Sequence, residues 1–326
     1  MMSRDQAPIE ELCQNVFVEE TTWESIVEAG FATLCVSENA GGFGGDVLEL
    51  WTVAREAGRA VLRQPVIANA ILPAHLLERA GETELHEAMM AGEVSVALAD
   101  ARDLHFEGGK LTGTVAVSGD QAPDRILVVS PQGELLLASA GADKWQSSAR
   151  IDGWPAGKIS FEQTEAVPIG GGNTRDLAKV AGRLNRLAAA AEIAGLTDRA
   201  VSLTVTFLGE RSQFGQKLSA FQALRHRMVD AMIAAQEIHA LSLRVALALE
   251  ADPVGADEGW LDALAVKGAQ VAELVGTEAV QMHGGVGTTD EYLVSHLFRR
   301  LTALILTCEA PGALMRLAAA ERGLPD

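Results

Sequence analysis

The chain has 326 residues, 48% of them hydrophobic, so it can bury a large core, and its length is typical of two or three domains or layers. Its formal net charge of −18 disfavours nucleic acid or an anionic membrane as a partner. No apolar run approaches the roughly 20 residues that span a bilayer, and the N-terminus lacks a signal-peptide core. These features predict a globular, cytoplasmic protein with no membrane association.

The cysteines and histidines give no indication of a structural metal or a disulfide framework. Cys13, Cys35 and Cys308 are far apart, and none belongs to a Cys-x-x-Cys pair. The seven histidines form no cluster with the spacing of metal ligands. We therefore expect no metal site.

The negative charge is unevenly distributed along the chain. Residues 174–326 contain 15 Lys and Arg against 18 Asp and Glu, a net charge of −3, which leaves −15 for the first 173 residues. An anionic cofactor or coenzyme is therefore expected to bind mainly against the C-terminal half.

Helical patterns with short breaks fill residues 1–93, which we predict to be an N-terminal helical domain. Residues 22–30 predict a capped helix that ends at a glycine, and residues 47–59 predict a second helix. A Gly-Gly-x-Gly run at 41–44 lies between them, and a tight turn is its simplest interpretation.

Residues 94–173 predict a small β domain followed by a linker. Short apolar or β-branched runs separated by turn residues occupy 94–99, 110–117, 125–129 and 134–139. The Gly-Gly-Gly-Asn run at 170–173 is interpreted as a linker. We do not expect it to follow a strand into a helix with the spacing of a dinucleotide-binding loop.

Residues 174–326 predict a four-helix bundle. Helical periodicity extends over four blocks, roughly 178–209, 219–250, 259–282 and 290–322. Four such blocks in succession are typical of antiparallel bundles.

Two motifs in this bundle have the chemistry of a cofactor site. Arg211 follows a helical run that Phe214-Gly215 then breaks, so its guanidinium could grip a diphosphate while the aromatic ring packs on a cofactor face. About 70 residues later, Gly284, Gly285 and Gly287 lie between two helical runs, where backbone without side chains can approach a ligand closely.

In this order and at this separation, residues 211–228 and 281–292 resemble the two C-terminal signatures of the acyl-CoA dehydrogenase family. The succession of helices, small β domain and four-helix bundle is similar to the family's layout over nearly the whole chain. The resemblance implies a mainly α fold with a small β domain. The short length is similar to that of divergent bacterial members whose two different subunits form heterotetramers that act on steroid or other bulky acyl-CoA thioesters.

The resemblance implies FAD-dependent α,β-desaturation of an acyl-CoA thioester. A carboxylate removes the α-proton, a β-hydride passes to flavin N5, and electrons leave through an electron-transfer flavoprotein. Hydrogen bonds to the thioester oxygen stabilise the developing enolate. It also implies a homo- or hetero-oligomer, either a dimer or a tetramer.

Positions that match the family's motifs imply the site residues. Arg211 and Phe214 resemble residues that contact the FAD of a neighbouring subunit, and Gln222 resembles a glutamine near its adenosine end. The segment that wraps the ADP part is matched by Gln281, Gly284 and Gly285. Ser118 would supply a hydrogen bond to the flavin, although the segments around it lack the family's usual flavin-covering residues. Alternatively, Arg211 forms a surface ion pair, Gln222 is a surface amide, and the glycines only make turns.

The catalytic base is the least well matched feature. Counting from Glu291 with the spacing of one subgroup reaches Cys308, and Glu309 follows one residue later, with Ala310-Pro311 in place of the usual Gly-Thr. Another subgroup carries its base on the first bundle helix, where this chain has Asn185, whose amide accepts no proton. Glu309 is therefore the candidate base in this chain.

Two other functions remain open. The chain could be a non-catalytic structural subunit that completes the FAD site of a partner acyl-CoA dehydrogenase. It could also be a helical binding protein whose glycine motifs are simple turns.

Overall fold

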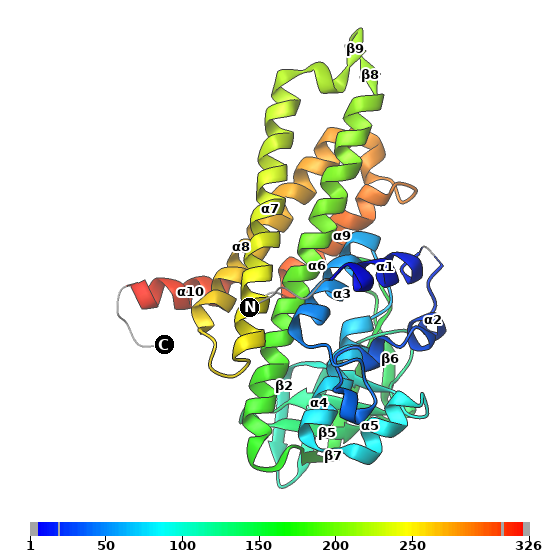
Figure 1. The fold of residues 1–326 in the computed structure, drawn as a ribbon, viewed down its shortest axis with the longest axis vertical. Coiled ribbons are helices and arrows are strands. Elements are labelled where there is room, and N and C mark those ends of the chain that lie inside the picture. Colours follow the sequence, from blue (N-terminus) through cyan, green and yellow to red (C-terminus); the bar gives the residue numbers. More distant parts are fainter. Residues whose placement is uncertain (1–5, 19, 308–309, 322–326) are drawn as a thin grey trace.

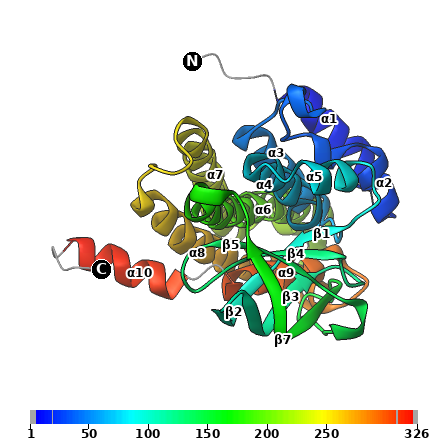
Figure 2. The same ribbon diagram turned by 90° about the horizontal axis from the view of Figure 1, so that it is seen from below.

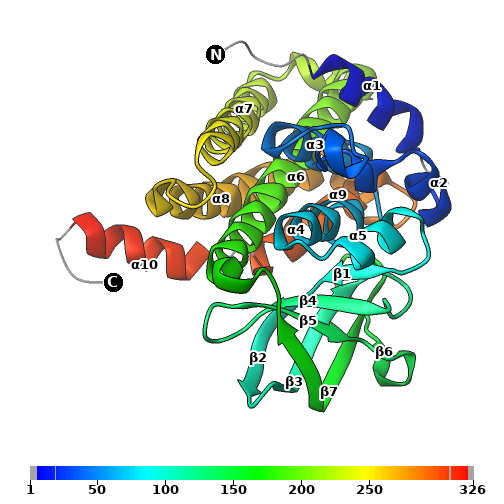
Figure 3. The ribbon, with the colours of Figure 1, turned by 60° about the horizontal axis from the view of Figure 1, so that its bottom comes forward.

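The computed structural model describes residues 6–18, 20–307 and 310–321. Three layers follow one another along the chain: short N-terminal helices, a β layer and a bundle of long helices (Figure 1). The sheet lies at one end of the molecule, beneath the N-terminal helices and the start of α6 (Figure 3). The mainly α fold with a small β domain is confirmed.

The N-terminal helices form where local signals predict them. Thr22 caps the helix at 23–28, its hydroxyl accepting from the Ser25 N–H at 3.3 Å, and Gly30 follows with φ +75°. The Gly-Gly-x-Gly run is a compact turn, in which a side chain at Gly42 would collide with the Val36 carbonyl. The helices are α1 (Ala7–Val16), α2 (Trp23–Glu28), α3 (Val47–Ala60), α4 (Leu72–Ala80) and α5 (Thr83–Met90).

The β layer contains the four predicted runs and three strands that the sequence pattern did not reveal, β2, β6 and β7. The sheet order is β1-β4-β5-β7-β3-β2, and β6 pairs with β7. The strands are β1 (Val96–Leu98), β2 (Asp100–Glu107), β3 (Lys110–Ser118), β4 (Arg125–Val129), β5 (Leu135–Ser139), β6 (Trp145–Ser147) and β7 (Ala156–Pro168).

Strand β7 is central to this sheet because it pairs with β3, β5 and β6. Ile159 and Phe161 are buried and alternate with exposed residues, but this alternation ends at Gln163, which adopts φ +53° where the register shifts. The run at 170–173 lies between the end of β7 and the start of the next helix. It lacks the glycine spacing of a dinucleotide loop and forms a short turn.

The bundle confirms the four predicted helical blocks, with the last one divided in two. The helices are α6 (Thr174–Glu210), α7 (Gln222–Ala251), α8 (Glu258–His283), α9 (Leu293–Thr307) and α10 (Ala310–Glu321). Pro311 stands in the first turn of α10, a position that proline favours. Helix α10 projects from the body of the molecule (Figure 2).

Helix α7 differs from one expectation drawn from the sequence. By length and composition alone it could cross a membrane, and α9 with α10 passes the same test only as a bent pair. In this structure α7 packs against α6 and α8, and core helices of soluble proteins pass that test as well.

Helices α3 and α6 cross so closely that glycine is required on both. A side chain at Gly58 would collide with the Glu192 carbonyl, and one at Gly195 would collide with the Arg55 carbonyl. These contacts fix α6 against the N-terminal layer and so position the α6 residues described below.

We expect Gly195→Ala to destabilise the protein by at least about 1 to 3 kcal/mol, because its methyl group forces the two backbones apart. Urea denaturation measures the loss. Gly209→Ala is the matched control on the same helix, since a methyl group there meets nothing within 4 Å and should be neutral or stabilising. Equal stability of the two variants would contradict the close helix crossing.

Candidate functional site

Two adjoining cavities lie where the three layers meet. Cavity A has a volume of about 320 Å³ and cavity B about 390 Å³. Both are lined by Leu98 at the end of β1, by Asn185 and Ala189 on one face of α6, and by Thr307 at the end of α9. The four shared residues make the cavities two parts of one open site.

The walls of these cavities are largely hydrocarbon. Cavity A extends between α6 and α8, past Gly182, Leu261 and Leu264. Cavity B extends between the sheet and α9, past Val66, Ile67, Ala188, Ala303 and Leu304. Such walls can bury an apolar ligand and exclude water from it.

Ser118 lies at the sheet wall of cavity B, as the last residue of β3. Its carbonyl accepts a hydrogen bond from Asn69 Nδ2 at 2.8 Å. Asn69 belongs to the π-helical segment Ile67–Ile71, and such segments are frequent at functional sites. The predicted hydroxyl is thus beside the cavity, with its backbone held in place.

Arg186, next to Asn185, is held by carboxylates of α8. It donates to Glu258 Oε1 at 3.1 Å and to Asp262 Oδ1 at 2.7 Å. Arg316 on α10 donates to both oxygens of Asp262, at 2.9 and 2.6 Å. Burial alone would raise the pKa of Asp262, but the bonds from Arg316 and Arg186 outweigh it and lower that pKa.

A buried ionic cluster lies beside cavity B, at its α9 side. Arg300 on α9 donates to both oxygens of Glu192 on α6, at 2.6 and 2.9 Å, and to Asp152 Oδ2 at 2.9 Å. Its guanidinium lies 3.8 Å from the ring centroid of Trp154. Burial would raise the pKa of Asp152, but the Arg300 bond, the Trp154 N–H and Arg150 lower it.

The sequence did not lead us to predict this ionic cluster. Glu192 is the only carboxylate among the described residues that line cavity A or cavity B, and it is engaged by Arg300. Its spacing of seven residues from Asn185 placed both on one face of α6, which was the available signal. Nothing in the sequence around Arg300 indicated its partners.

Arg211 and Phe214 lie in a hairpin between α6 and α7. The hairpin pairs β8 (Ser212–Gln213) with β9 (Gln216–Lys217), and Phe214-Gly215 form its two-residue turn with φ +55° and +78°. Phe214 is 88% exposed and contacts only Phe221 as a ring partner, with centroids 6.2 Å apart. A large aromatic residue in the left-handed region and in solvent is typical of a binding surface.

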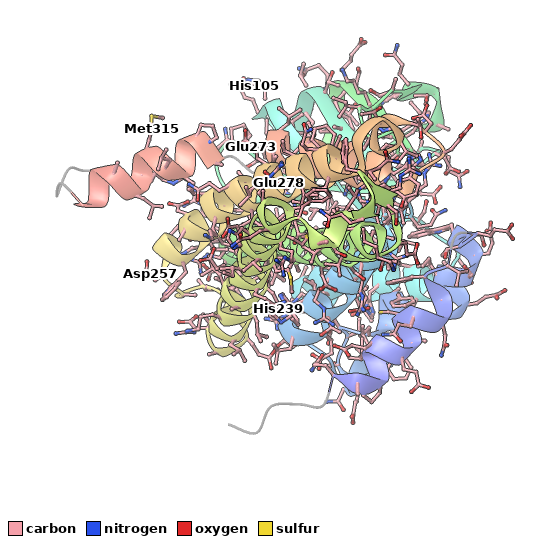
Figure 4. All side chains as sticks on the ribbon, turned by 90° about the horizontal axis from the view of Figure 1, so that it is seen from above. His105, His239, Asp257, Glu273, Glu278 and Met315 are labelled. Atoms are coloured by element: carbon pink, nitrogen blue, oxygen red, sulfur yellow. The ribbon has the colours of Figure 1, made fainter. Side chains whose placement is uncertain are left out.

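The fold brings the two cofactor motifs to one end of the bundle. Phe207, one turn before Arg211, stacks on His283 with ring centroids 4.4 Å apart. At the start of α7, Arg227 Nε donates to Glu278 of α8 at 2.8 Å (Glu278 is labelled in Figure 4). The predicted residues Gln222 and Gln281, both exposed, therefore lie at this same end.

The glycine motif has open backbone beside a buried histidine. Side chains at Gly284 or Gly285 would meet nothing within 4 Å, whereas Gly287 is packed against His283 and Val280. His283 Nδ1 donates to the Ala279 carbonyl at 2.7 Å, and burial lowers its pKa. Its Nε2 is buried without a partner among the described residues, so an incoming donor would be satisfied there. These features fit the close approach of a ligand that carries a hydrogen-bond donor.

The cavities and this end of the bundle are far apart in one chain. Arg211 is 22 residues beyond Ala189 on a continuous helix, which places it about 33 Å away along the axis. Gln281 is 13 residues beyond Gly268, or about 20 Å. Ser118 and Arg211 therefore cannot meet at one point of this chain.

Glu309 and Cys308 lie outside the described residues. Thr307, which precedes them in the chain, lines both cavities, and so does Asn185. The first position considered for the base, at 308–309, therefore directly follows a residue of the cavity wall. The second, Asn185, is part of that wall.

Comparisons with known proteins agree with this architecture. The profile of the acyl-CoA dehydrogenase N-terminal domain matches residues 2–95, and that of the C-terminal domain matches residues 177–307. The acyl-CoA dehydrogenase IpdE2 of Mycobacterium tuberculosis is 27% identical over 303 residues, covering 91% of this chain and 85% of that protein.

Solved structures share the fold at lower identity. A variant of the Tcur3481-Tcur3483 steroid ACAD has a TM-score of 0.85 at 22% identity, covering 97% of this chain and 98% of that one. A chain of the ChsE4-ChsE5 complex from Mycobacterium tuberculosis has a TM-score of 0.81 at 22% identity, covering 98% and 96%. The chain belongs to the acyl-CoA dehydrogenase family.

Proposed function

We propose that the chain takes part in FAD-dependent α,β-desaturation of an acyl-CoA thioester, as one subunit of a dimer or tetramer. The separation of the cavities from the cofactor motifs carries this proposal. A single chain has the apolar cavities A and B in one place and Arg211, the residue expected to bind a diphosphate, about 33 Å away. Two chains that exchange these ends would each complete the other's site.

Each residue has a defined task in this proposal. Arg211 and Phe214, with Gln222 and the glycine motif from Gln281, would hold the FAD of a neighbouring subunit. When bound, FAD supplies the acceptor for the β-hydride. Ser118 would donate a hydrogen bond from the wall of cavity B, and the hydrocarbon walls would exclude water from the acyl group. Glu309 would accept the α-proton, and an electron-transfer flavoprotein would accept the electrons.

A non-catalytic structural subunit is the second candidate function. One observation favours it: Glu192, the carboxylate that lines cavity B, is engaged by Arg300, and Asn185 carries an amide. In that case Arg211 and the glycine motif would serve a partner's FAD while the partner supplies the base. Expression of the chain alone and with a second acyl-CoA dehydrogenase-like chain distinguishes the two. Bound flavin is scored by absorbance, and turnover by its bleaching with acyl-CoA.

Arg211→Ala should weaken FAD retention about tenfold to a hundredfold, because a charge-assisted bidentate bond contributes about 1.5 to 3 kcal/mol. Flavin occupancy after gel filtration is the measurement, and Arg211→Lys should recover only part of it. Arg175→Ala is the control, an exposed arginine at the opposite end of α6. Unchanged occupancy in Arg211→Ala would rule out the assigned role.

Light scattering should report a dimer or tetramer, alone or with a partner chain. Large apolar side chains are exposed on the outer face of α7, including Ile233 at 54%, and on α10, where Met315 is 70% exposed and points outward (Figure 4). Faces of this kind are typical of protein interfaces. A monodisperse monomer with full FAD content and turnover would refute this expectation.

A further inference from the structure

A third cavity adjoins cavity B and opens on the surface between the N-terminal layer, α6 and α9. Its volume is about 1070 Å³, and it shares Leu62, Arg63, Gln64, Trp154 and Pro155 with cavity B. We call it the basic groove, after the cationic side chains that line it. They are Arg59, Arg63, Arg199 and Arg299.

The two carboxylates that line the groove pair with arginines that lie outside it. Glu56 bonds to Arg55 at 2.6 Å, and Asp152 bonds to Arg300 and Arg150 at 2.9 and 3.1 Å. Arg55 also bonds to Glu10 at 2.6 Å, so this group keeps one negative charge beside the groove. The arginines that line the groove outnumber that charge.

The lining arginines are only partly paired. Arg59 approaches Asp198 at 3.5 Å with both side chains about half exposed, and Arg299 bonds to the exposed Asp290 at 2.8 Å. Such surface pairs are weak. Arg63 donates to the Gly153 carbonyl at 2.6 Å, and Arg199 has no hydrogen bond or ion pair within the described chain. Arg299 also donates to Ser295 and His296, so the N–H groups available to a ligand anion are mainly those of Arg199, Arg63 and Arg59.

The basic groove is close to cavities A and B. Helix α9 presents Arg299 to the groove, Ala303 and Leu304 to cavity B, and Thr307 to cavities A and B. Eight residues separate Arg299 from Thr307, which is about 12 Å along the helix. A ligand whose reacting carbons lie near Thr307 can therefore place its far end among the arginines.

We propose that the basic groove binds a carboxylate at the far end of the acyl group, so that the substrate is an acyl-CoA with a second, anionic terminus. This rests on the function proposed above. Arginine forks match a carboxylate in bidentate geometry. On the way from Thr307 to the groove, cavity B is lined by Leu62, Pro65, Val66 and Ile67, which can pack against a hydrocarbon chain. The amides of a pantetheine arm would lose hydrogen bonds to water there, so we place the acyl end in this direction.

The test measures binding rather than turnover. The FAD-loaded protein, with any chain that copurifies, is titrated by calorimetry with ω-carboxyacyl-CoA thioesters of increasing chain length. Each is paired with the methyl-ended acyl-CoA of equal length. Wild type should bind the carboxylated member more tightly once the chain is long enough to reach the groove. Arg63→Gln and Arg199→Gln should each reduce this preference about tenfold, since one charge-assisted bond contributes about 1.5 to 3 kcal/mol.

Arg175→Gln is the matched control, because Arg175 is exposed on the same helix as Arg199 and lines none of the three cavities. Its preference should equal that of wild type. Equal binding of both thioesters to wild type would overturn the proposal. An equal loss of affinity for both thioesters in Arg63→Gln and Arg199→Gln would also overturn it, because it would show that the groove binds the phosphates of CoA. Failure of wild type to bind any acyl-CoA would instead contradict the proposed function itself, and this proposal with it.

Discussion

Glu309→Gln should retain the fold and the bound flavin, yet slow flavin bleaching by acyl-CoA about 10²-fold to 10⁴-fold. Glutamine is nearly isosteric with glutamate, but its amide cannot accept the α-proton, and removal of a general base typically costs this much in rate. Stopped-flow absorbance of the flavin under single-turnover conditions measures the chemical step. Flavin content and thermal unfolding of the variant show that the site is otherwise intact.

A second substitution separates the loss of a base from other damage. Asn185 lines cavities A and B, so Asn185→Glu places a carboxylate on their wall from α6. In the Glu309→Gln background it should restore part of the bleaching, whereas Asn185→Gln, the isosteric amide, should not. If Glu309→Gln alone reduces flavin at nearly the wild-type rate, the base is elsewhere. The partner subunit is then its first candidate source, as expected for the structural-subunit function.

Arg300→Met should destabilise the protein by about 3 to 5 kcal/mol, the usual cost of removing one partner from a buried ion pair. The substitution removes both hydrogen bonds to Glu192 and leaves Asp152 with Arg150 and the Trp154 N–H, while Met fills most of the arginine's volume. Urea denaturation at neutral pH is the measurement.

Replacing the acids together with the arginine tests the cause. Arg300→Met combined with Glu192→Gln and Asp152→Asn leaves no unpaired charge, so it should be more stable than Arg300→Met alone. Equal stability of the two would show that lost packing on Trp154, rather than buried charge, dominates.

The same cluster predicts a pH dependence with a defined sign. In wild type the folded pKa of Asp152 is lowered, so its contribution to stability is present above the unfolded value of about 4 and is lost as pH falls through the folded pKa. In Arg300→Met, Asp152 is still buried but has lost the hydrogen bond from Arg300 that lowers its pKa. Its protonated form is therefore favoured. The stability gap between wild type and variant should therefore narrow as pH falls from 7 toward 4.

The sequence by itself determined the layers and the family. Helical blocks such as 178–209 are long, and their apolar residues recur with a period close to 3.6, a local property that tertiary contacts did not overturn. The break in the helical pattern at Phe214-Gly215 was equally local, but the pairing of β8 with β9 around it was not predicted. Strand β7 was missed because only two large apolar residues, Ile159 and Phe161, mark its alternation before the irregularity at Gln163 ends it.

Only the tertiary structure decided how these parts are combined. The length of α6 places Arg211 about 33 Å from the cavities that Ala189 lines, which is why the motifs indicate a shared site between chains. Arg300 contacts Glu192 across 108 residues and Asp152 across 148, and the arginines of the groove come from α3, the loop that follows it, α6 and α9. A periodic pattern records which face of an element is buried. It does not record which charge on another element that face will meet, because that depends on how the elements pack.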